Sequence, residues 1–567
     1  MKKHISIIII SALSLTLSLW SCNDVLNLDN TEILSDLAIW STEKSAELYI
    51  TASYKTFTDV SQVANSREQF HDSYSDLMKS TSWDQYNHHY NKSLLQVSSF
   101  STGSAGAHEC WEDVYTRIRR ANVLMDDIKR YGVPSFGEDW CNIRRAEVRL
   151  CRAFSYYRLI RVYGGIVIRT DVSGASGGVD DGAYEKDKHR ARATEAQSWE
   201  FVISELQWAA EFLPESWPAN WEGRATKKTA YGLISRMALF AKKWQIAIDA
   251  AEKTKELGGD LAANYAKVFQ VNGAQNNSAE ILFGLYFMNE TVTHSYDKFN
   301  RPFGDREVYK TNAIFAEHVP TADLADLYEF ANGENFAWNS YAANHTDPYT
   351  EREPRFHATI MYNNCSWENR EIQTYAGGTD DFSAFTQSGA TSGHTCTGYY
   401  LRKYLQEDYK DFVIQNSYQY DAVLRYAEVL LNNAEAYAEL DYMQYQSQAL
   451  EALNKVRTRV GLPEKTANDA PNKDAFMTLL RKERCVELAG EGFRYWDLRR
   501  WGLAQNVING KNAHGVVVTK NNDNTFSYER VAVDGGSPRI FLQSYYYFSL
   551  PRQEFANNNL CENNLYW

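Results

Sequence analysis

The sequence lacks the short motifs that mark two large groups of enzymes. It contains neither the HExxH motif of zinc hydrolases nor the GxxxxGK[ST] loop that cradles nucleotide phosphates. Its eight cysteines are widely spread and no two of them form a CxxC pair, so their spacing indicates neither a disulfide framework nor a structural zinc site. Most of these thiols are expected to be free and buried. We therefore expect no metal, no cofactor and no catalytic residues.

Positive charge is also scarce. The 59 lysines and arginines are outnumbered by 72 aspartates and glutamates, which gives a formal net charge of −13. Nucleic-acid-binding proteins usually present a basic face, and electrostatic attachment to anionic lipid likewise needs basic clusters. The composition therefore argues against both kinds of partner. With 44% hydrophobic and 23% charged residues, the chain of 567 residues can still bury a sizeable core.

The N-terminus carries an apolar run. Two lysines precede apolar residues 5–20, a run that is too short to span a membrane comfortably and is typical of an export signal. The sequence LWSC, which ends at Cys22, resembles the lipobox of bacterial lipoproteins, in which the cysteine is acylated after cleavage. We expect residues 1–21 to be a signal peptide and residues 22–35 to be a tether from the lipidated Cys22. The protein would then be anchored to a membrane without spanning it.

Apolar residues recur at helical spacing along much of the chain. The pattern predicts helices over 36–58, 107–131, 144–163, 194–213, 224–242, 244–257 and 427–462. Two stretches, 229–253 and 427–462, have the rhythm of tetratricopeptide helix pairs, with Ala247 and Ala449 at the expected crossing points. Such pairs stack into a superhelix in which each pair buries its face on the next. The sequence therefore predicts a mainly α fold, a superhelix of helical pairs similar to tetratricopeptide repeats, with a large irregular insert.

Two parts of the chain lack this periodicity. Residues 59–106 are rich in Ser, Asn and Tyr and read as a long loop, and residues 260–420 form a larger segment rich in Asn, Tyr, Gly and Thr. We expect the folded body to have three parts. They are a helical part over 36–259, an irregular ligand-binding lobe over 260–420, and C-terminal helices with a closing segment over 421–567.

Aromatic residues make up 14% of the chain, and in the irregular parts they alternate with amides and hydroxyls. Flat aromatic faces with a polar edge suit stacking on sugar rings, while amide side chains at the rim can bond hydroxyl groups. Loops have little core to fill, so these residues are candidates for a ligand surface. The candidate ligand-binding residues are Trp83, Tyr86, Asn87, Tyr90, Tyr286, Trp338, Asn339, Tyr341 and Trp367.

The stretch over residues 473–502 combines an apolar stripe with many charges. Phe476, Leu479 and Leu480 fall at helical spacing on one face of a predicted helix, and charged residues crowd the opposite face. Glu487 and Glu491 could serve acid–base chemistry. Arginines surround them in the sequence, however, and would lower their pKa values, which favours a structural ion-pair network sealed by aromatic residues.

A second acidic group consists of Asp323, Asp326 and Glu329, which have helical spacing. No pattern of oxygen ligands like that of an EF-hand surrounds them, so a calcium site is not favoured. We expect these carboxylates to face solvent.

The run RKERCVELAGEGFRYWDLRRWG, residues 481–502, resembles the C-terminal signature of the SusD/RagB family of outer-membrane nutrient-binding lipoproteins. We refer to it as the signature run. A second landmark of that family, an arginine- and alanine-rich helix ending in Tyr-Gly-Gly, is similar to residues 144–165. The segments DPYTEREPRF (347–356) and YYYFSLPRQEFANNNLCENNLYW (545–567) also resemble the family, with Glu353 in place of the usual aspartate. The resemblance covers the whole mature chain.

The resemblance implies a SusD-like lipoprotein at the cell surface, anchored in the outer membrane. Such a protein captures an oligosaccharide or polysaccharide and hands it to a SusC-like TonB-dependent transporter, and its ligand surface is built from loops in the two irregular regions. Three alternatives remain open. They are peptide cargo, as in the RagB branch, cleavage of a glycan by paired carboxylates, and a tetratricopeptide-type scaffold for protein partners.

Overall fold

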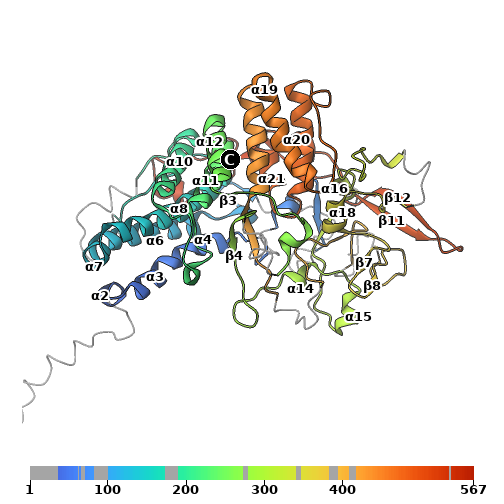
Figure 1. The fold of residues 1–567 in the computed structure, drawn as a ribbon, viewed down its shortest axis with the longest axis horizontal. Coiled ribbons are helices and arrows are strands. Elements are labelled where there is room, and N and C mark those ends of the chain that lie inside the picture. The colour runs from blue at the N-terminus through green and yellow to red at the C-terminus, as the bar shows by residue number, and fades with distance from the viewer. Residues whose placement is uncertain are drawn as a thin grey trace, which may run out of the picture.

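The computed structural model describes residues 36–61, 63–64, 70–81, 100–172, 189–271, 279–339, 347–381, 394–407, 417–535 and 538–567. Helices dominate these residues and the strands are short, so the predicted mainly α fold is confirmed. Figure 1 shows the long helices across the upper and left parts of the molecule and the irregular segments with their short strands at the lower right.

The N-terminal helices form a stack in which each long helix packs against the next. Local residues set the ends of these helices. The side chains of Thr194 and Gln197 form a reciprocal capping box at the start of α10, and α8 ends at Gly164, which adopts φ +73°. The elements are α2 (Asp36–Ile39), α3 (Glu43–Thr51), α4 (Lys55–Thr58), α6 (Trp111–Asp127), α7 (Val133–Phe136), α8 (Glu138–Tyr163), α10 (Glu195–Phe212), α11 (Lys227–Phe240) and α12 (Trp244–Glu256).

Several of the predicted helices have different bounds in the structure. The helix expected over 36–58 is divided into α2, α3 and α4, with a 3₁₀ turn at Ala52–Tyr54 between the last two. The helix expected over 107–131 begins at Trp111 and ends in a π-helical turn, Ile128–Gly132. The helix expected over 144–163 is α8, which begins earlier, at Glu138. The helices expected over 194–213, 224–242 and 244–257 are confirmed as α10, α11 and α12.

The helical stack continues after the irregular segments. Helix α19 (Tyr426–Thr458) packs against both α12 and α20 (Lys473–Glu487), and Figure 1 shows the three side by side. Asp441 and Tyr445 have non-helical backbone angles, so α19 consists of two helical halves that meet at a kink, as the sequence predicts for a helix pair. The shorter C-terminal helices are α21 (Arg494–Arg500), α22 (Ala504–Ile508) and α23 (Arg552–Asn557).

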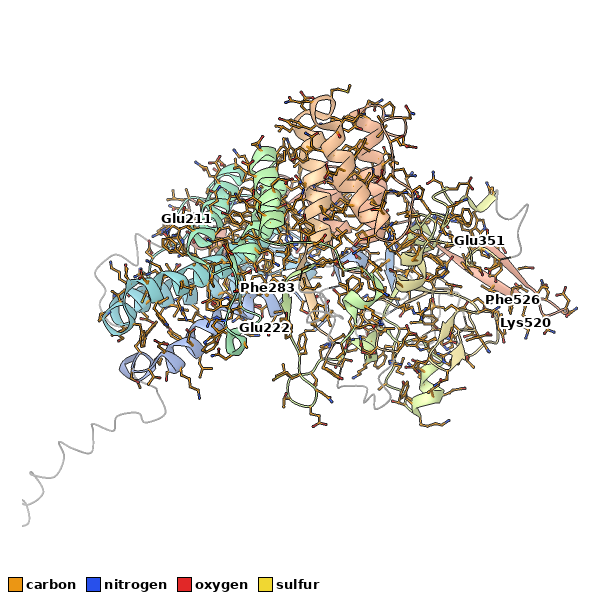
Figure 2. The ribbon with its side chains drawn as sticks, in the orientation of Figure 1. Glu211, Glu222, Phe283, Glu351, Lys520 and Phe526 are labelled. Carbon is orange, nitrogen blue, oxygen red and sulfur yellow. The ribbon has the colours of Figure 1, made fainter. Side chains whose placement is uncertain are left out.

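The strands of the described residues occur in two-stranded antiparallel pairs. The longest pair is the hairpin of β11 and β12, and Figure 2 shows Lys520 and Phe526 near its projecting tip. The pairs are β1 (Met78–Ser80) with β5 (His318–Pro320), β2 (Phe100–Ser101) with β3 (Ser104–Ala105), β4 (Ile281–Leu285) with β10 (Asp421–Arg425), β6 (Ile360–Met361) with β9 (Tyr400–Leu401), β7 (Ser366–Trp367) with β8 (Arg370–Glu371), and β11 (His514–Lys520) with β12 (Phe526–Ala532). The irregular lobe also contains α14 (Tyr296–Asn300), α15 (Asp305–Tyr309), α16 (Ala322–Ala325) and α18 (Pro354–Thr359).

Two large hydrophobic cores and a smaller cluster hold the described residues together. The first core lies among the helices and includes Tyr156, Leu233 and Trp496. The second lies inside the irregular lobe and includes Trp367 and Tyr399. The irregular lobe is therefore not a set of surface loops, because its aromatic residues also build an interior of their own.

Residues 541–567 return to the first helices of the chain. The backbone N–H of Phe548 donates to the carbonyl of Val162 at 2.9 Å, and the ring of Phe548 is buried in the first core. The N–H of Gly103 donates to the Ser549 hydroxyl at 2.7 Å. The N-terminal helical stack is thus completed by a segment that is distant in the sequence.

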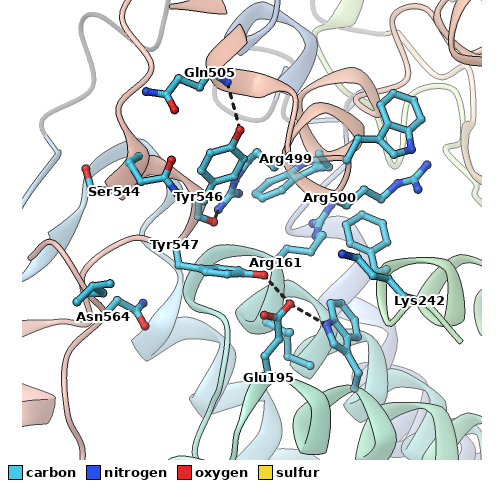
Figure 3. A pocket seen from close by; sticks show the side chains of 18 of the residues that line it. Arg161, Glu195, Lys242, Arg499, Arg500, Gln505, Ser544, Tyr546, Tyr547 and Asn564 are labelled. Atoms are coloured by element: carbon cyan, nitrogen blue, oxygen red, sulfur yellow. Dashed lines mark hydrogen bonds between the residues drawn. The ribbon is translucent and has the colours of Figure 1, made fainter. Parts of the chain in front are cut away.

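The signature run spans the end of α20, a turn at two glycines, and α21. Phe476 and Leu480 of α20 are fully buried and Leu479 is partly buried against the same core, which confirms the predicted apolar stripe. Trp496 of α21 is also buried and packs back onto the helical core, as expected for the aromatic cluster. Figure 3 shows Arg499 and Arg500 of α21 at the edge of a cavity between α21 and the N-terminal helices.

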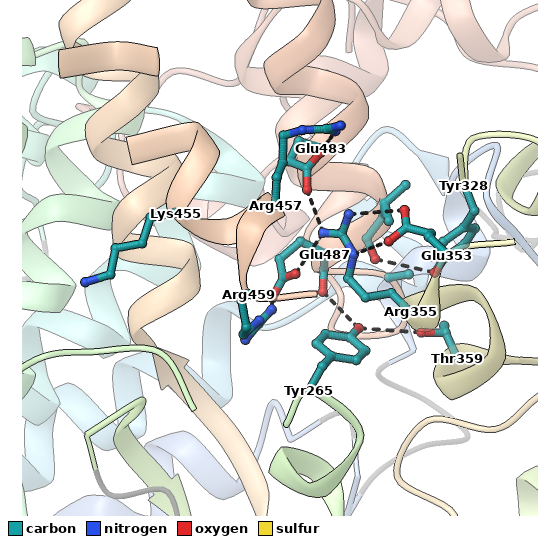
Figure 4. A network of polar contacts seen from close by, with 12 residues as sticks. Tyr265, Tyr328, Glu353, Arg355, Thr359, Lys455, Arg457, Arg459, Glu483 and Glu487 are labelled. Atoms are coloured by element: carbon teal, nitrogen blue, oxygen red, sulfur yellow. Dashed lines mark hydrogen bonds and ion pairs between the residues drawn. The ribbon is translucent and has the colours of Figure 1, made fainter. Parts of the chain in front are cut away.

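The predicted ion-pair network is confirmed, but its cations come from outside the signature run. Fully buried Glu487 bonds three arginines, Arg355 at 3.0 Å, Arg425 at 2.6 Å and Arg459 at 2.5 Å. Figure 4 shows Arg355 and Arg459 converging on this carboxylate. Burial alone would raise its pKa, but Arg459, Arg425 and Arg355 hold the pKa of Glu487 well below its usual value. Because Arg355 belongs to α18, the network ties the irregular lobe to the helices.

Glu491 is held in the same way. Its carboxylate bonds Lys403 at 2.6 Å and Arg425 at 2.7 Å, and these cations lower its pKa although burial alone would raise it. A carboxylate that is buried and kept ionised is a poor general acid. The structural interpretation of Glu487 and Glu491 therefore holds.

The expectation that the second acidic group faces solvent is wrong for Glu329. Its side chain is only 2% exposed and bonds Arg457 at 2.7 Å and Lys482 at 3.0 Å, so the ends of α19 and α20 cover it. Asp323 and Asp326 are paired as well, both with Arg530 of β12. The helical spacing was also misleading, because α16 ends at Ala325 and only Asp323 of the three lies in a helix.

Candidate ligand-binding surface

Tyr286 lies where the irregular lobe meets the helical stack. It directly follows β4, and because Leu285 pairs with Asp421 in the antiparallel ladder, Tyr286 comes opposite Tyr420. The two rings are stacked, with centroids 6.3 Å apart and an interplanar angle of 25°. Tyr420 is buried, whereas Tyr286 is 46% exposed. The pair therefore presents one supported aromatic face to solvent.

The connection between α10 and α11 reaches the same place. A β-carbon added to Gly223, whose φ is +92°, would lie 3.3 Å from the Tyr286 ring, so the missing side chain lets the ring approach the backbone closely. Burial, and after it the charge of Glu222 in this connection, raises the pKa of Tyr286, which places the two side chains close together. Trp217 and Trp221 belong to the same connection, and both are partly exposed. We call Trp217, Trp221 and Tyr286 the aromatic ledge.

Arg224 holds the two tryptophans of the ledge in place. Its guanidinium lies 4.6 Å from the ring centroid of Trp217 and 5.1 Å from that of Trp221. The same buried group bonds Glu47 and Glu147, each at 2.5 Å. Since the cation is fixed from behind by two carboxylates, the tryptophan rings in front of it are held rigidly, which limits the entropy lost when a ligand binds.

A tight loop beside Tyr286 adds apolar surface. Met288 and Val292 exchange backbone hydrogen bonds of 2.8 and 3.0 Å, which closes the loop between them. Their side chains are 58% and 47% exposed. Large apolar side chains that remain exposed next to an aromatic face are typical of a binding surface.

Trp338 and Asn339 lie in another part of the irregular lobe. The Trp338 ring is partly buried, with its centroid 5.5 Å from that of Phe336, and Asn339 is exposed. Gly333 of the same segment lies against Pro463, which follows α19. The structure thus keeps these two candidates accessible but places them among different neighbours from those of the ledge.

The prediction that Trp367 contacts a ligand is wrong. The side chain is fully buried in the second core, and its indole N–H donates to the carboxylate of Asp305 at 3.1 Å. The ring also lies 5.2 Å from the guanidinium of Arg301. An abundance of aromatic residues does not distinguish a residue of the core from one of the surface, and here the residue belongs to the core.

Five other candidates cannot be placed. Trp83, Tyr86, Asn87, Tyr90 and Tyr341 lie outside the described residues, as does the lipidation candidate in the N-terminal segment.

Sequence reasoning missed Trp217 and Trp221. A signal was present, since both occur in PESWPANWEG, a connection rich in turn residues that has little core to fill.

Two kinds of site, a metal site and a glycoside-cleaving carboxylate pair, place definite requirements on the described residues. Among them, no group of three or more His, Cys, Asp or Glu side chains is arranged to hold a metal ion. The paired carboxylates that glycoside cleavage would need are not supplied by Glu487 and Glu491, which are enclosed. None of the described helices is both long and apolar enough to cross a membrane.

Comparison with known proteins identifies the class to which this combination of a helical superhelix and an irregular lobe belongs. The sequence profile of the SusD family matches residues 279–567, and a profile described as "starch-binding associating with outer membrane" matches residues 24–239. The chain belongs to the SusD family.

Several known proteins resemble the chain over most of its length. SusD-like protein P25 of Formosa agariphila is 23% identical and aligns with 87% of this chain and 89% of its own. The crystal structure of a SusD-like carbohydrate-binding protein from Bacteroides fragilis superimposes with a TM-score of 0.76 at 23% identity, covering 92% of this chain and 99% of that one. A laminarin-binding SusD-like protein superimposes with a TM-score of 0.63 at 19% identity, covering 93% and 100% of the two chains.

Proposed function

We propose that this chain is a cell-surface glycan-binding protein that delivers oligosaccharides or polysaccharide to a SusC-like TonB-dependent transporter in the outer membrane. The observation that carries the proposal is the aromatic ledge, in which Tyr286 is exposed, Trp217 and Trp221 are partly exposed, and all three rings are supported from behind. Aromatic faces of this kind stack on the CH faces of sugars. The proposed contacts also include Trp83, Tyr86, Asn87, Tyr90, Trp338, Asn339 and Tyr341.

Membership of the SusD family supports this function. Two relatives of similar fold are named as binding carbohydrate and laminarin, and one matching profile is described as starch-binding and associated with the outer membrane. The protein binds its cargo without cleaving it, and acylation of Cys22 anchors it to the outer membrane at the cell surface. Energy for uptake comes from the transporter.

The first test is a binding screen of residues 23–567 against a panel of neutral polysaccharides and a mixture of peptides. Affinity gels would identify the retarding glycan, and calorimetry would measure its dissociation constant. We expect Tyr286→Ala and Trp221→Ala to weaken binding at least about tenfold. Tyr445→Ala, which removes a partly exposed ring at the kink of α19, is the matched control and should bind normally.

Other outcomes would replace the proposal. Binding of peptides alone would show that the cargo is peptide, as in the RagB branch. Release of reducing ends from any polysaccharide would show that the protein is an enzyme. Normal binding by both ledge variants would show that the glycan binds at another part of the surface. The anchor is tested separately, because Cys22→Ser should release the full-length protein from the membrane fraction.

A further inference from the structure

A large cavity lies between the N-terminal helices and α21. Its volume is about 960 Å³, and its walls come from the end of α8, from α10 and α11, from α21 and α22, and from the C-terminal segment. Figure 3 shows Arg161, Glu195 and Arg499 around it. Its rim includes the exposed side chains of Gln505 and Tyr566, so the cavity is open to solvent. A cavity of this size suits a ligand of one or two sugar rings.

Two arginines in the wall lack acidic partners. Within the described part of the chain, Arg161 forms no ion pair and no hydrogen bond, and its buried Nε has no acceptor. Arg499 is only 7% exposed. Of its three side-chain nitrogens, only Nη2 has an acceptor, the carbonyl of Tyr546. Its Nε and Nη1 are buried without partners. Donors of a charged group that are left unsatisfied inside a protein are costly, and a bound ligand is a common reason for them.

The indole of Trp496 holds the two guanidiniums in position. Arg161 lies 4.2 Å from the ring centroid and Arg499 lies 4.8 Å from it. Burial lowers the pKa of each arginine, whereas arginines with acidic partners elsewhere in the core have raised pKa values. Stacking on an aromatic face fixes the direction of the N–H groups but accepts no hydrogen bond from them.

The charged neighbours in the wall do not neutralise these arginines. Arg500 is already paired, with Glu435 at 2.5 Å and with Asp497 at 2.8 Å. Glu195 accepts hydrogen bonds from the Tyr547 hydroxyl at 2.5 Å and from the Trp199 indole at 3.2 Å, and it forms no ion pair with Arg161 or Arg499. The wall therefore offers two fixed cations, each with at least one donor that has no partner, beside aromatic rings and one polar acceptor.

We propose that this cavity binds a carboxylate-bearing sugar, namely one uronate unit or two linked uronate units. The free N–H groups of Arg161 and Arg499 receive the carboxylate, since planar guanidinium and carboxylate groups match in geometry. The rings of Phe240 and Tyr547 pack against the CH faces of the sugar, and Glu195 accepts from its hydroxyls. The choice of a sugar as the carrier of the carboxylate rests on the proposed function, whereas the anion site itself rests on the two arginines.

Calorimetry with digalacturonate and with its uncharged methyl ester tests the proposal. We expect residues 23–567 to bind the acid at least about tenfold more tightly than the ester, and more weakly as NaCl is raised. Arg161→Gln should remove this preference, and Arg161→Lys, which keeps the charge but loses the planar donors, should reduce it. Lys243→Gln removes a charge that is paired with Glu200 outside the cavity and should leave the preference unchanged.

Several results would overturn the inference. Equal affinity for acid and ester, or an unchanged preference in Arg161→Gln, would show that the arginines do not bind the carboxylate. Binding of acidic peptides in place of digalacturonate would show that the carrier is not a sugar. Tyr286→Ala separates the two proposals, because it should leave the binding of digalacturonate intact. If the neutral glycans all fail to bind while digalacturonate binds through Arg161, the cavity proposal stands and the ledge proposal fails.

Discussion

Arg355 and Glu487 form an ion pair in an interior that excludes water, with Nη1 3.0 Å from Oε2 and both side chains at most 1% exposed. The arginine belongs to α18 in the irregular lobe and the glutamate to α20 in the helical stack. Each of the two side chains also pairs with other charged residues, so the pair is one link of the network drawn in Figure 4. The attachment of the irregular lobe to the helices therefore depends on buried charge as well as on apolar contact.

Removal of one member of this pair should lower the stability of the folded protein. We expect Arg355→Met to lower the free energy of unfolding by about 3–5 kcal/mol, because Glu353, Glu483 and Glu487 would remain buried with less compensation. Urea denaturation followed by circular dichroism would measure the loss. The control is Arg130→Met, which removes an exposed pair with Asp126 and should change stability by less than about 1 kcal/mol. Similar losses in both variants would refute a special role for the network.

The two kinds of aromatic residue should respond differently to truncation. Trp496→Ala removes a buried ring and is expected to cost about 3–5 kcal/mol of stability. Tyr286→Ala should leave the melting temperature nearly unchanged while weakening glycan binding, and we expect the same of Trp83→Ala and Trp338→Ala. Differential scanning calorimetry and glycan titration of the same preparations would check this. A loss of stability in Trp338→Ala as large as that in Trp496→Ala would remove Trp338 from the ligand surface.

Glu329 should contribute to the pH dependence of stability. Burial alone would raise the pKa of its carboxyl, but Arg457 and Lys482 lower it to about 2. Because the pKa in the folded state is below that in the unfolded state, the contribution is complete above about pH 4.5 and is lost as the pH falls towards 2. The difference in unfolding free energy between the wild type and Glu329→Gln should therefore be constant from pH 7 to pH 6 and shrink below about pH 4.5. Urea titrations at pH 7, 5 and 3.5 would show this, and a difference independent of pH would contradict it.

The thiols should be unreactive in the native state. Seven free cysteines lie among the described residues, six buried and Cys110 intermediate, as the sequence predicted. Burial raises the pKa of Cys485 to about 12 and that of Cys110 to about 11, so little thiolate forms at neutral pH. We expect iodoacetamide at pH 8 to leave the folded form of residues 23–567 largely unlabelled and to label all seven cysteines in 6 M guanidinium. Rapid labelling of several thiols before unfolding would indicate that the interior opens readily.

The sequence allowed the helices to be predicted because their periodicity is local. The apolar stripe of Phe476 and Leu480 and the pairing of α11 with α12 follow from spacing alone. The partners of Glu487 could not be derived in this way, since Arg355 and Arg425 come from segments 132 and 62 residues distant. Spacing shows that a face is charged but does not show which distant segment covers it.

The ligand surface was predicted less well than the fold. Tyr286 was correctly expected to be exposed, whereas Trp367 was expected at the surface and lies in the core. Both are aromatic residues in irregular segments, and only the three-dimensional packing separates them. Trp217 and Trp221 join Tyr286 because Gly223 permits a close approach between two segments, which spacing in the sequence cannot reveal.

The return of residues 541–567 to the first helices has a consequence for the biogenesis of the protein. The ribosome completes α6 and α8 several hundred residues before it makes the segment with Phe548 and Ser549 that closes their core. The helices can form early, but their shared interior cannot close until almost the whole chain has been synthesised. A polypeptide with this arrangement remains loosely folded, with part of its apolar interior open to water, until its last residues leave the ribosome.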